Sequence, residues 1–399
     1  MNRLTLGLAV LLIACGDDSA PVDAGRDAVM PDAPVDASFD SAIDTALDAP
    51  MDPSRFVDPS AYEYDWVCSG EVAPTGTLPD MEPPTEDCSE GVWPDLDVTT
   101  LACPTVTDVM RDDPVSGLTL PLDDERELPL EIPVSESGSF IPAGAPTTWP
   151  DTLRVVAWNM EYSSNLDAQI DSLVDDPELG AADVYLLSEV DRCSTRNGVR
   201  RAARLLAERV QGAYVYGIEF VELSIGREIG GDTGQAIVSR RPITGASLLC
   251  HSSQFDWFES EREPRLGQRV VLHADIPAGD GEVRVWAVHL ESNDAFGELR
   301  AVQAKELLDA SQASACDRPQ IVAGDFNAWY DTAPELVVFK ANGFTDALAE
   351  LGDDGSTHDS GRRLDYVFTR GFDITDGAVL REIRTSDHAP MWVDVRVSP

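Results

Sequence analysis

Basic side chains are scarce in this sequence. Its 399 residues include 29 Lys and Arg against 72 Asp and Glu, which gives a formal net charge of −43. Such a chain lacks the basic patch by which most nucleic-acid-binding domains hold the phosphate backbone. The shortage does not exclude a polyanionic substrate, because a bound divalent cation can supply positive charge locally.

The charge is also distributed unevenly along the chain. Residues 1–150 carry 30 acidic and five basic side chains, whereas residues 151–399 carry 42 and 24. The first part therefore has the composition of a solvated, extended segment. The second part has the mixed charge of a globular domain.

Long hydrophobic runs are missing as well. The one apolar run near the N-terminus, residues 4–14, is too short to span a bilayer but has the length of a signal-peptide core. It ends in Leu12-Ile13-Ala14-Cys15, which resembles a bacterial lipobox. The resemblance implies a lipoprotein signal peptide over residues 1–14, lipidation of Cys15, and an exported protein anchored to a membrane at the cell envelope or outer surface. An ordinary secretory signal with an incidental Cys15 is the alternative.

The seven cysteines contain no C-x-x-C spacing, which argues against a zinc site made of thiolates. If lipid occupies Cys15, six cysteines remain, and an even number in an oxidising compartment predicts disulfides. Six thiols allow 15 connectivities, and the sequence does not choose among them.

Two segments precede the globular part. Residues 15–54 are rich in Asp, Ala, Pro and Ser without periodicity, and we predict a disordered acidic tether. Residues 55–150 contain three clustered cysteines and frequent prolines, and we predict a small extension of unknown role that packs on, or leads into, the main domain. Proline at positions 121, 129 and 133 restricts any strand there to a sheet edge.

From residue 151 onward, apolar strands alternate with amphipathic helices. "LRVVAWNM" and "ADVYLLSEV" are typical of buried strands, and "NLDAQIDSLVDD" places its apolar residues on one helical face. Some neighbouring strands are joined by hairpin-length turns and others by helices. This pattern predicts an α/β fold with a mixed sheet, or two sheets, flanked by helices.

Polar residues recur at the C-terminal ends of these strands. Asn159 ends "VVAWNME", Glu189 ends "VYLLSEV", His289 ends "VWAVHLES", and Asp325 and Asn327 end "IVAGDFN". Strand ends are where side chains from distant parts of an α/β chain can meet. The repetition predicts one shared site.

These segments carry a family resemblance. In order, "AWNME", "LLSEVD", "VHLES", "GDFNA", "RRLDYVF" and "SDHAP" resemble the endonuclease/exonuclease/phosphatase superfamily, whose fold is deoxyribonuclease-I-like. The resemblance covers about residues 155–397 and implies a four-layer α/β/β/α sandwich for a catalytic domain at 151–399. Two positions depart from the family pattern: Ser188 stands for a usual Gln, and Gln235 for a usual Asn.

The resemblance implies a metal site. Glu189 corresponds to the principal ligand, with Asn159 and Asp387 close to the same ion. Oxygen ligands of this kind suit Mg²⁺, with Mn²⁺ or Ca²⁺ as alternatives.

The resemblance also implies the catalytic groups. Asp365 and His388 form an expected dyad, in which the carboxylate fixes the imidazole tautomer. Asp325 is a second candidate for the general base, and the sequence leaves the choice open. His289 is expected on the opposite side of the phosphate, with Asn327 orienting a phosphoryl oxygen.

The remaining histidines, His251, His273 and His358, match no catalytic position, and we assign them structural roles. Arg196 and Asn197 follow the Glu189 strand and are candidates for binding substrate phosphate. A role in starting the next helix is the alternative for both.

The expected function is that of a surface-tethered, monomeric phosphodiesterase or nuclease that hydrolyses extracellular nucleic acid, with no protein partner. A phosphatase or a phospholipid- or sphingomyelin-type phosphodiesterase is the second interpretation. A catalytically inert binding protein on the same fold is the third, but it predicts the loss of catalytic positions, and none is lost.

Overall fold

The structure is a computed structural model that describes residues 135–198, 200–222, 231–255, 257, 265–315 and 318–398. The predicted signal peptide, the acidic tether and most of the extension lie outside these residues. So do Cys15 and four of the six other cysteines, and the disulfide pairing stays a prediction.

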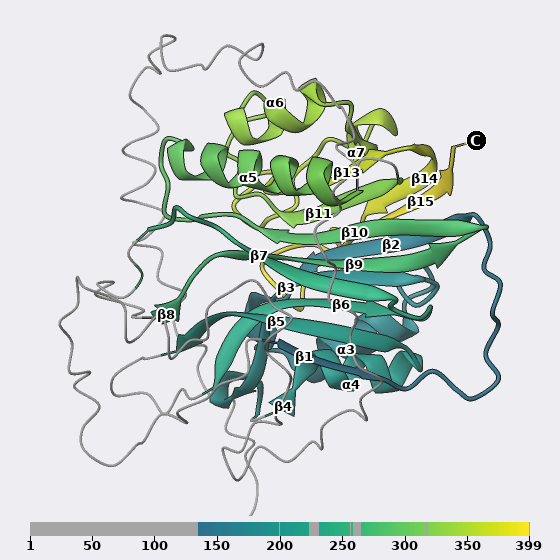
Figure 1. Ribbon diagram of the computed structural model, residues 1–399. Helices are drawn as coiled ribbons and strands as arrows, with labels where there is room; N and C mark the ends of the chain where they lie inside the picture. The colour runs from purple at the N-terminus through teal and green to yellow at the C-terminus, as the bar shows by residue number, and fades with distance from the viewer. Residues whose placement is uncertain are drawn as a thin grey trace, which may run out of the picture. The chain divides into compact units, whose positions relative to one another are not determined.

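The described chain forms two β-sheets (Figure 1). The first has the strand order β1-β5-β6-β3-β2-β15-β14, with β4 beside β3 and β8 beside β5. In that order its strands are Ser135–Ser139, Ala213–Glu222, Asp232–Ser239, Val184–Ser194, Thr152–Asn159, Met391–Val397 and Phe372–Val379, with Arg200–Arg201 as β4 and Arg265–Gly267 as β8.

The second sheet has the order β12-β13-β11-β10-β9-β7. Its strands are, in that order, Thr345–Asp346, Asp365–Arg370, Gln320–Asp325, Gly281–His289, Val270–Ala278 and Gly245–Cys250. Each sheet has one parallel pair near its centre, β2 with β3 and β10 with β11. Parallel neighbours bring the carboxyl ends of their strands to the same edge, and the two pairs carry most of the predicted site residues.

Helices cover the outer faces of the sheets. Helices α3 (Leu166–Asp175) and α4 (Ala202–Val210) pack on the first sheet, and α5 (Glu298–Ala315) and α6 (Pro334–Ala341) pack on the second (Figure 1). The short α7 (Ala347–Glu350) lies at the β13–β14 side. The predicted four-layer α/β/β/α sandwich is confirmed.

The alternation along β10 explains the layering. Val285 and Ala287 belong to the core between the sheets, whereas Trp286 and Val288 belong to the core under α5 and α6. A period of two sends successive side chains to opposite faces, so an all-apolar strand is buried on both. Full burial of each such side chain contributes about 1.5–3 kcal/mol, which makes the double-sided core the main stabilising element.

The first sheet begins at Ser135, before the predicted start of the catalytic domain at residue 151. Strand β1 pairs with β5, and its Glu136 is buried against Arg192, Arg201 and the hydroxyl of Tyr214. A buried carboxylate needs such partners because an unpaired one is costly to desolvate. Residues 135–139, assigned to the extension from the sequence, are thus held in the main sheet.

Membrane-spanning character is not found in the described helices: none of them has both the length and the apolar content needed to cross a bilayer.

His273 lies on β9, buried, with its ring 4.5 Å from the ring of Trp286. Its predicted structural role agrees with this position. Burial, aided by Arg284, lowers the pKa of His273 from 6.5 to about 3. The unfolded chain therefore binds a proton near pH 6.5 that the folded chain does not accept until about pH 3, so stability is lost as pH falls through this window.

We expect His273→Phe to remove this part of the acid sensitivity while keeping an aromatic ring against Trp286. Between pH 7 and pH 4, the wild type should lose about 3 kcal/mol more unfolding free energy than the variant, because one pKa unit corresponds to about 1.4 kcal/mol. Urea unfolding followed by tryptophan fluorescence at both pH values measures the difference. Parallel losses in the two proteins would contradict the assignment.

Candidate functional site

Three site residues lie side by side on the second sheet because of strand register. Asp325 on β11 is the partner of His289 on the parallel strand β10 and of Asp365 on the antiparallel strand β13. Residues in register project from the same face of a sheet. His289 and Asp365 are 76 positions apart in the sequence, and the strand pairing places them on either side of Asp325.

Gly324 allows the close approach of β10 and β11 just before Asp325. Its φ is +139°, and a Cβ atom built on it would lie 2.1 Å from the carbonyl oxygen of Val288. Any other residue would push the two strands apart at the end where His289 and Asp325 stand.

The first sheet reaches the same site through β2. The Asn159 side-chain amide donates to Asp325 Oδ2 at 3.1 Å, and the Trp158 indole donates to the carbonyl of His388 at 2.8 Å. All of these groups are buried. The two hydrogen bonds tie the end of β2 to both the second sheet and the loop before β15.

The predicted dyad is formed. His388 Nδ1 lies 2.7 Å from Asp365 Oδ2, and the hydroxyl of Thr357 donates to the same oxygen at 2.7 Å. Burial opposes protonation of His388, but Asp365, followed by Asp325 and Asp387, raises its pKa well above the usual value. The imidazolium form is favoured, with Nδ1 directed at Asp365 and Nε2 left for the site.

Asp325 lies between two imidazoles. Its Oδ2 is 3.8 Å from Nε2 of His289 and 3.8 Å from Nε2 of His388. Its Oδ1 accepts the backbone N–H of Asn327 at 2.7 Å, and the Asn327 side chain donates to the carbonyl of Leu290 at 3.0 Å. The carboxylate is thus held rigidly with one oxygen directed at the centre of the site.

His289 has a carboxylate partner that the sequence analysis missed. Nδ1 of His289 lies 3.4 Å from Glu219 Oε2 and 2.9 Å from Arg269 Nη1, and all three side chains are buried. Burial alone would raise the pKa of Glu219, but Arg269 and His289 lower it. The sequence signal was an acidic residue inside the apolar segment "YVYGIEFVE", which lies in β5.

Two of the proposed metal ligands, Glu189 and Asp387, lie close enough for their charges to interact. Glu189 stands at an irregularity of β3 with φ of +51°, and its Oε1 lies 3.7 Å from Nε2 of His289. Burial raises the pKa of Glu189, and so does the charge of Asp387, against the opposite effect of His289. A hard cation stabilises the ionised form of a poorly solvated carboxylate that lies near a second one. The residues therefore fit a divalent metal.

Glu161 links the other two expected ligands. Its backbone N–H donates to Asn159 Oδ1 at 3.0 Å, and its carboxylate accepts the backbone N–H of Asp387 at 3.1 Å. Burial and the neighbouring Asp387 raise the pKa of Glu161. This residue, within the "AWNME" motif, adds a carboxylate that the sequence analysis did not assign.

The side chains of Arg196 and Asn197, predicted to bind substrate phosphate, are bonded to neighbouring protein groups. Arg196 donates to both oxygens of Asp191 at 3.0 and 3.1 Å and stacks 4.0 Å from the ring of Tyr162. Asn197 is buried, and its amide bonds backbone groups of Asp191 and Arg200. The geometry favours the alternative, a role in shaping the loop before α4, because the side-chain atoms are already bonded.

The two departures from the family pattern are both buried. Gln235 bonds the backbone of β9 through Val270 and Leu272, so it joins the two sheets. Ser188 lies in β3 next to Glu189, and its hydroxyl has no hydrogen-bond partner among the described residues.

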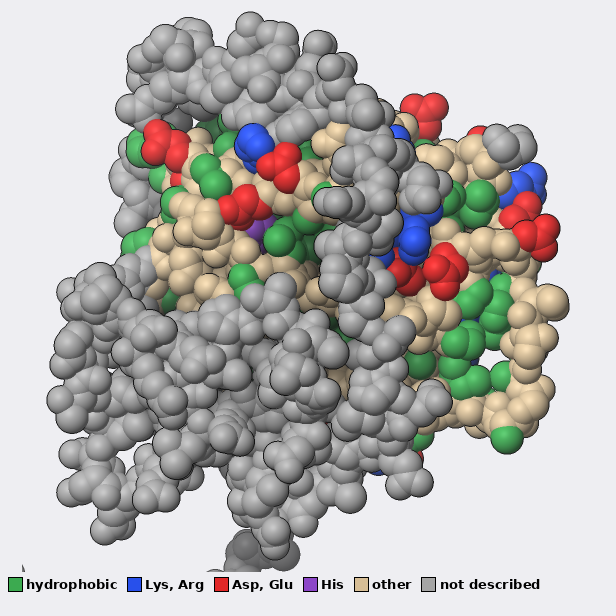
Figure 2. Space-filling model, in the orientation of Figure 1, with side chains coloured by type: hydrophobic (Ala, Val, Ile, Leu, Met, Phe, Trp, Pro, Cys, Tyr) green, Lys and Arg blue, Asp and Glu red, His purple; other side chains and the backbone are tan. Residues whose placement is uncertain are grey.

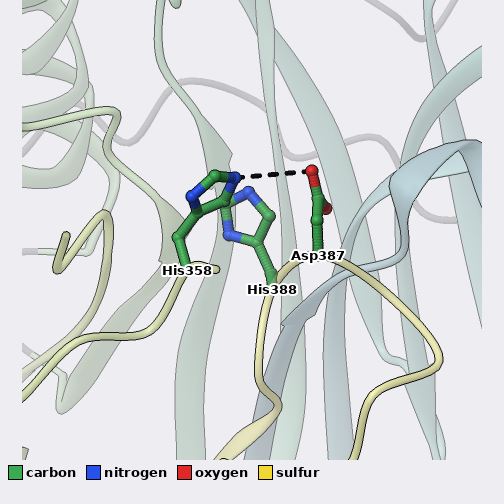
Figure 3. Close-up of side chains that lie close together, drawn as sticks. All are labelled: His358, Asp387 and His388. Atoms are coloured by element: carbon green, nitrogen blue, oxygen red, sulfur yellow. Dashed lines mark ion pairs between the residues drawn. The ribbon is translucent and has the colours of Figure 1, made fainter. Parts of the chain in front are cut away.

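The other histidines divide into two kinds. His251 Nδ1 lies 2.8 Å from Glu306 Oε2 on α5, and His273 is buried in β9. His358 lies in the site itself, beside Asp387 and His388 (Figure 3). The sequence analysis missed it because no motif includes this residue.

Comparison with known proteins identifies a family. The sequence model of the Endonuclease/Exonuclease/phosphatase family matches residues 156–388, more than half of the chain. A UPF0294 protein of Yersinia enterocolitica is 34% identical over 137 residues, which are 34% of this chain and 51% of that protein. A UPF0294 protein of Klebsiella pneumoniae is 36% identical over 94 residues, 23% of this chain and 35% of that one. The chain spans about half or less of these curated relatives.

Solved structures of similar fold include an endonuclease/exonuclease/phosphatase from Beutenbergia cavernae. It is 23% identical, with a TM-score of 0.48, and the match covers 62% of this chain and 72% of that one. The human Nocturnin catalytic domain is 16% identical, with a TM-score of 0.47, and the match covers 63% and 97%.

The dyad gives a direct test on the metal-free protein. We expect Asp365→Asn to lower the pKa of His388, because the variant keeps the shape of the side chain but removes the negative charge that favours the imidazolium. Thr357→Val is the matched control: it removes a hydroxyl from the same oxygen but leaves the charge, so the pKa should not fall. NMR titration of the imidazole protons reports both, and an unchanged midpoint in Asp365→Asn would refute the pairing.

Proposed function

Because the chain belongs to the endonuclease/exonuclease/phosphatase family, which includes metal-dependent phosphoesterases and nucleases, we propose that it is a divalent-metal-dependent phosphodiesterase acting on extracellular nucleic acid. The observation that carries the proposal is the position of Asp325 between His289 and His388, each 3.8 Å away. Each imidazole is in turn backed by a carboxylate, Glu219 or Asp365.

The arrangement supplies the groups that phosphoester hydrolysis needs. A water must lose a proton, the attacked phosphoryl group must be stabilised, and the leaving oxygen must be neutralised. The Asp325 carboxylate is suited to accept the proton, since its Oδ2 points between the two imidazoles. His388 and His289 then act as N–H donors to phosphoryl or leaving oxygens, and the remaining N–H of the Asn327 amide orients another.

Glu189, Asn159 and Asp387 would hold the cation. Mg²⁺ suits their oxygen atoms, and Mn²⁺ or Ca²⁺ uses the same kind of ligand. When bound, the cation neutralises phosphate charge and acts as a Lewis acid. It would also reduce the repulsion between the Glu189 and Asp387 carboxylates, which raises the pKa of Glu189.

Two features bear on the substrate. The face drawn in Figure 2 carries small, separate groups of acidic and basic side chains, and the residues coloured there form no continuous basic patch. This favours weak binding mediated by the metal.

Trp329, two residues beyond Asn327, lies 5.1 Å from the guanidinium of Arg362, and Tyr330 beside it is 38% exposed. Aromatic side chains can stack on any nucleobase, which favours nucleic acid over a lipid head group.

The metal ligand Glu189 provides the test of function. We expect Mg²⁺-dependent cleavage of plasmid DNA or RNA by the purified wild type, loss of that cleavage with EDTA, and recovery when Mg²⁺ is added back. Glu189→Gln should lower turnover by roughly 100-fold or more, because it removes the charge of a principal ligand while keeping its shape.

A substrate panel decides among the alternatives. Plasmid, RNA, a nucleotide ester and a phospholipid are offered under identical conditions, with His251→Gln as a control histidine outside the site. Turnover of the phospholipid alone would reject nucleic acid as substrate. If no phosphoester is turned over, and His388→Ala is indistinguishable from wild type, the enzyme assignment itself fails.

Localisation is a separate part of the proposal. We propose that Cys15 carries a lipid anchor and that residues 15–54 tether the catalytic domain to a membrane of the cell envelope. In a bacterial host, the full chain should fractionate with membranes and incorporate labelled fatty acid, and Cys15→Ser should appear in the soluble fraction with its catalytic activity unchanged. Membrane association that survives Cys15→Ser would contradict lipidation.

A further inference from the structure

His358 is the third histidine of the site. It lies on the loop between α7 and β13 and forms an isolated β-bridge with His388. The two rings are 4.6 Å apart at 72°, and His358 Nε2 lies 3.4 Å from Asp387 Oδ2 (Figure 3). Backbone hydrogen bonds from Ala389 to Thr357 and from Asp359 to Asp387 hold the two loops together.

Ser360 fixes the tautomer of this histidine. The backbone N–H of Ser360 donates to His358 Nδ1 at 3.0 Å, and the Ser360 hydroxyl lies 2.7 Å from the same nitrogen. A backbone N–H can only donate, so Nδ1 must accept and the ring proton of the neutral imidazole resides on Nε2. Nε2 is the atom that faces Asp387.

A protonated Nε2 has no lone pair for a metal ion. His358, Asp387 and His388 each offer a ligand atom within 4.8 Å of the others, which by distance alone could hold a cation. The Ser360 hydrogen bond opposes direct ligation by His358 and favours donation of Nε2–H to the carboxylate instead.

Asp387 needs an orienting partner. Its side chain is 42% exposed, and among the described residues its carboxylate has two side-chain contacts of 3.4 Å, His358 Nε2 at Oδ2 and the Ser386 hydroxyl at Oδ1. Carboxylates that bind metals are usually held by a hydrogen bond to one oxygen, which leaves the second oxygen aimed at the ion.

We propose that His358 is a positioning residue that holds Oδ2 of Asp387 and thereby directs Oδ1 toward the divalent cation. The inference rests on the metal site of the proposed function. It extends that site to a loop outside the motifs, through the 3.4 Å contact between His358 Nε2 and Asp387 Oδ2, in which the Ser360 N–H places the imidazole proton on Nε2.

The test measures metal binding without turnover. The metal-free full chain is titrated with Mn²⁺ alone, and the dissociation constant is measured by calorimetry or by the loss of the free Mn²⁺ electron paramagnetic resonance signal. His358→Ala should weaken binding by about 10-fold, within the 10–100-fold range typical for loss of a ligand's hydrogen-bond partner. His358→Gln, whose amide N–H can take the place of Nε2–H, should stay within about 3-fold of wild type.

His251→Gln is the matched control, because it disrupts a histidine–glutamate pair outside the site and should leave the Mn²⁺ affinity unchanged. Circular dichroism establishes that each variant is folded. Wild-type affinity in His358→Ala would overturn the inference and leave the proposed function intact. Equal weakening by Ala and Gln would also overturn it, since the imidazole itself would then be the ligand. A wild type that binds no Mn²⁺ would overturn the metal site and the inference together.

Discussion

The face-to-face packing of two sheets is the constraint on which the site depends. The side chains of the site lie at the ends of strands from both sheets, so neither sheet alone contains the site. The hydrogen bond from the Asn159 amide to Asp325 crosses between the sheets at this point, and Gln235 makes a second crossing from β6 to β9. The apolar residues between the sheets supply the stability, and the crossing hydrogen bonds fix the relative position of the strand ends.

The distribution of charge follows from that geometry. In a chain with net charge −43, most carboxylates buried near the site have a cationic or imidazole partner, such as Arg269 for Glu219 and His388 for Asp365. The contacts of Glu189 and Asp387 are longer: Glu189 Oε1 lies 3.7 Å from His289 Nε2, and Asp387 lies 3.4 Å from both His358 Nε2 and the Ser386 hydroxyl. The negative potential is thereby left where a cation is expected and compensated elsewhere.

The sequence predicted the layers and the strand-end residues because both depend on local patterns. Apolar runs marked β2, β3, β10 and β11, and the residue after each run was polar. The edge strands β7 and β14 have mixed burial, so they contain no continuous apolar run that would mark them in the sequence. Glu219 and His358 were not predicted as site residues, because their roles come from His289 and Asp387, which are 70 and 29 residues away. Arg196 had a suitable position and chemistry, and only the structure revealed its pairing with Asp191.

The edge strand β1 gives the domain a mechanical property. It is the first described element of the fold, and the preceding chain joins the domain at Ser135. Glu136, the second residue of β1, is joined by ion pairs to Arg192 on β3 and to Arg201 on β4. Arg192 is three residues beyond Glu189 on the same strand. Tension applied at that junction would therefore pass through these ion pairs into β3, the strand that carries the proposed metal ligand Glu189.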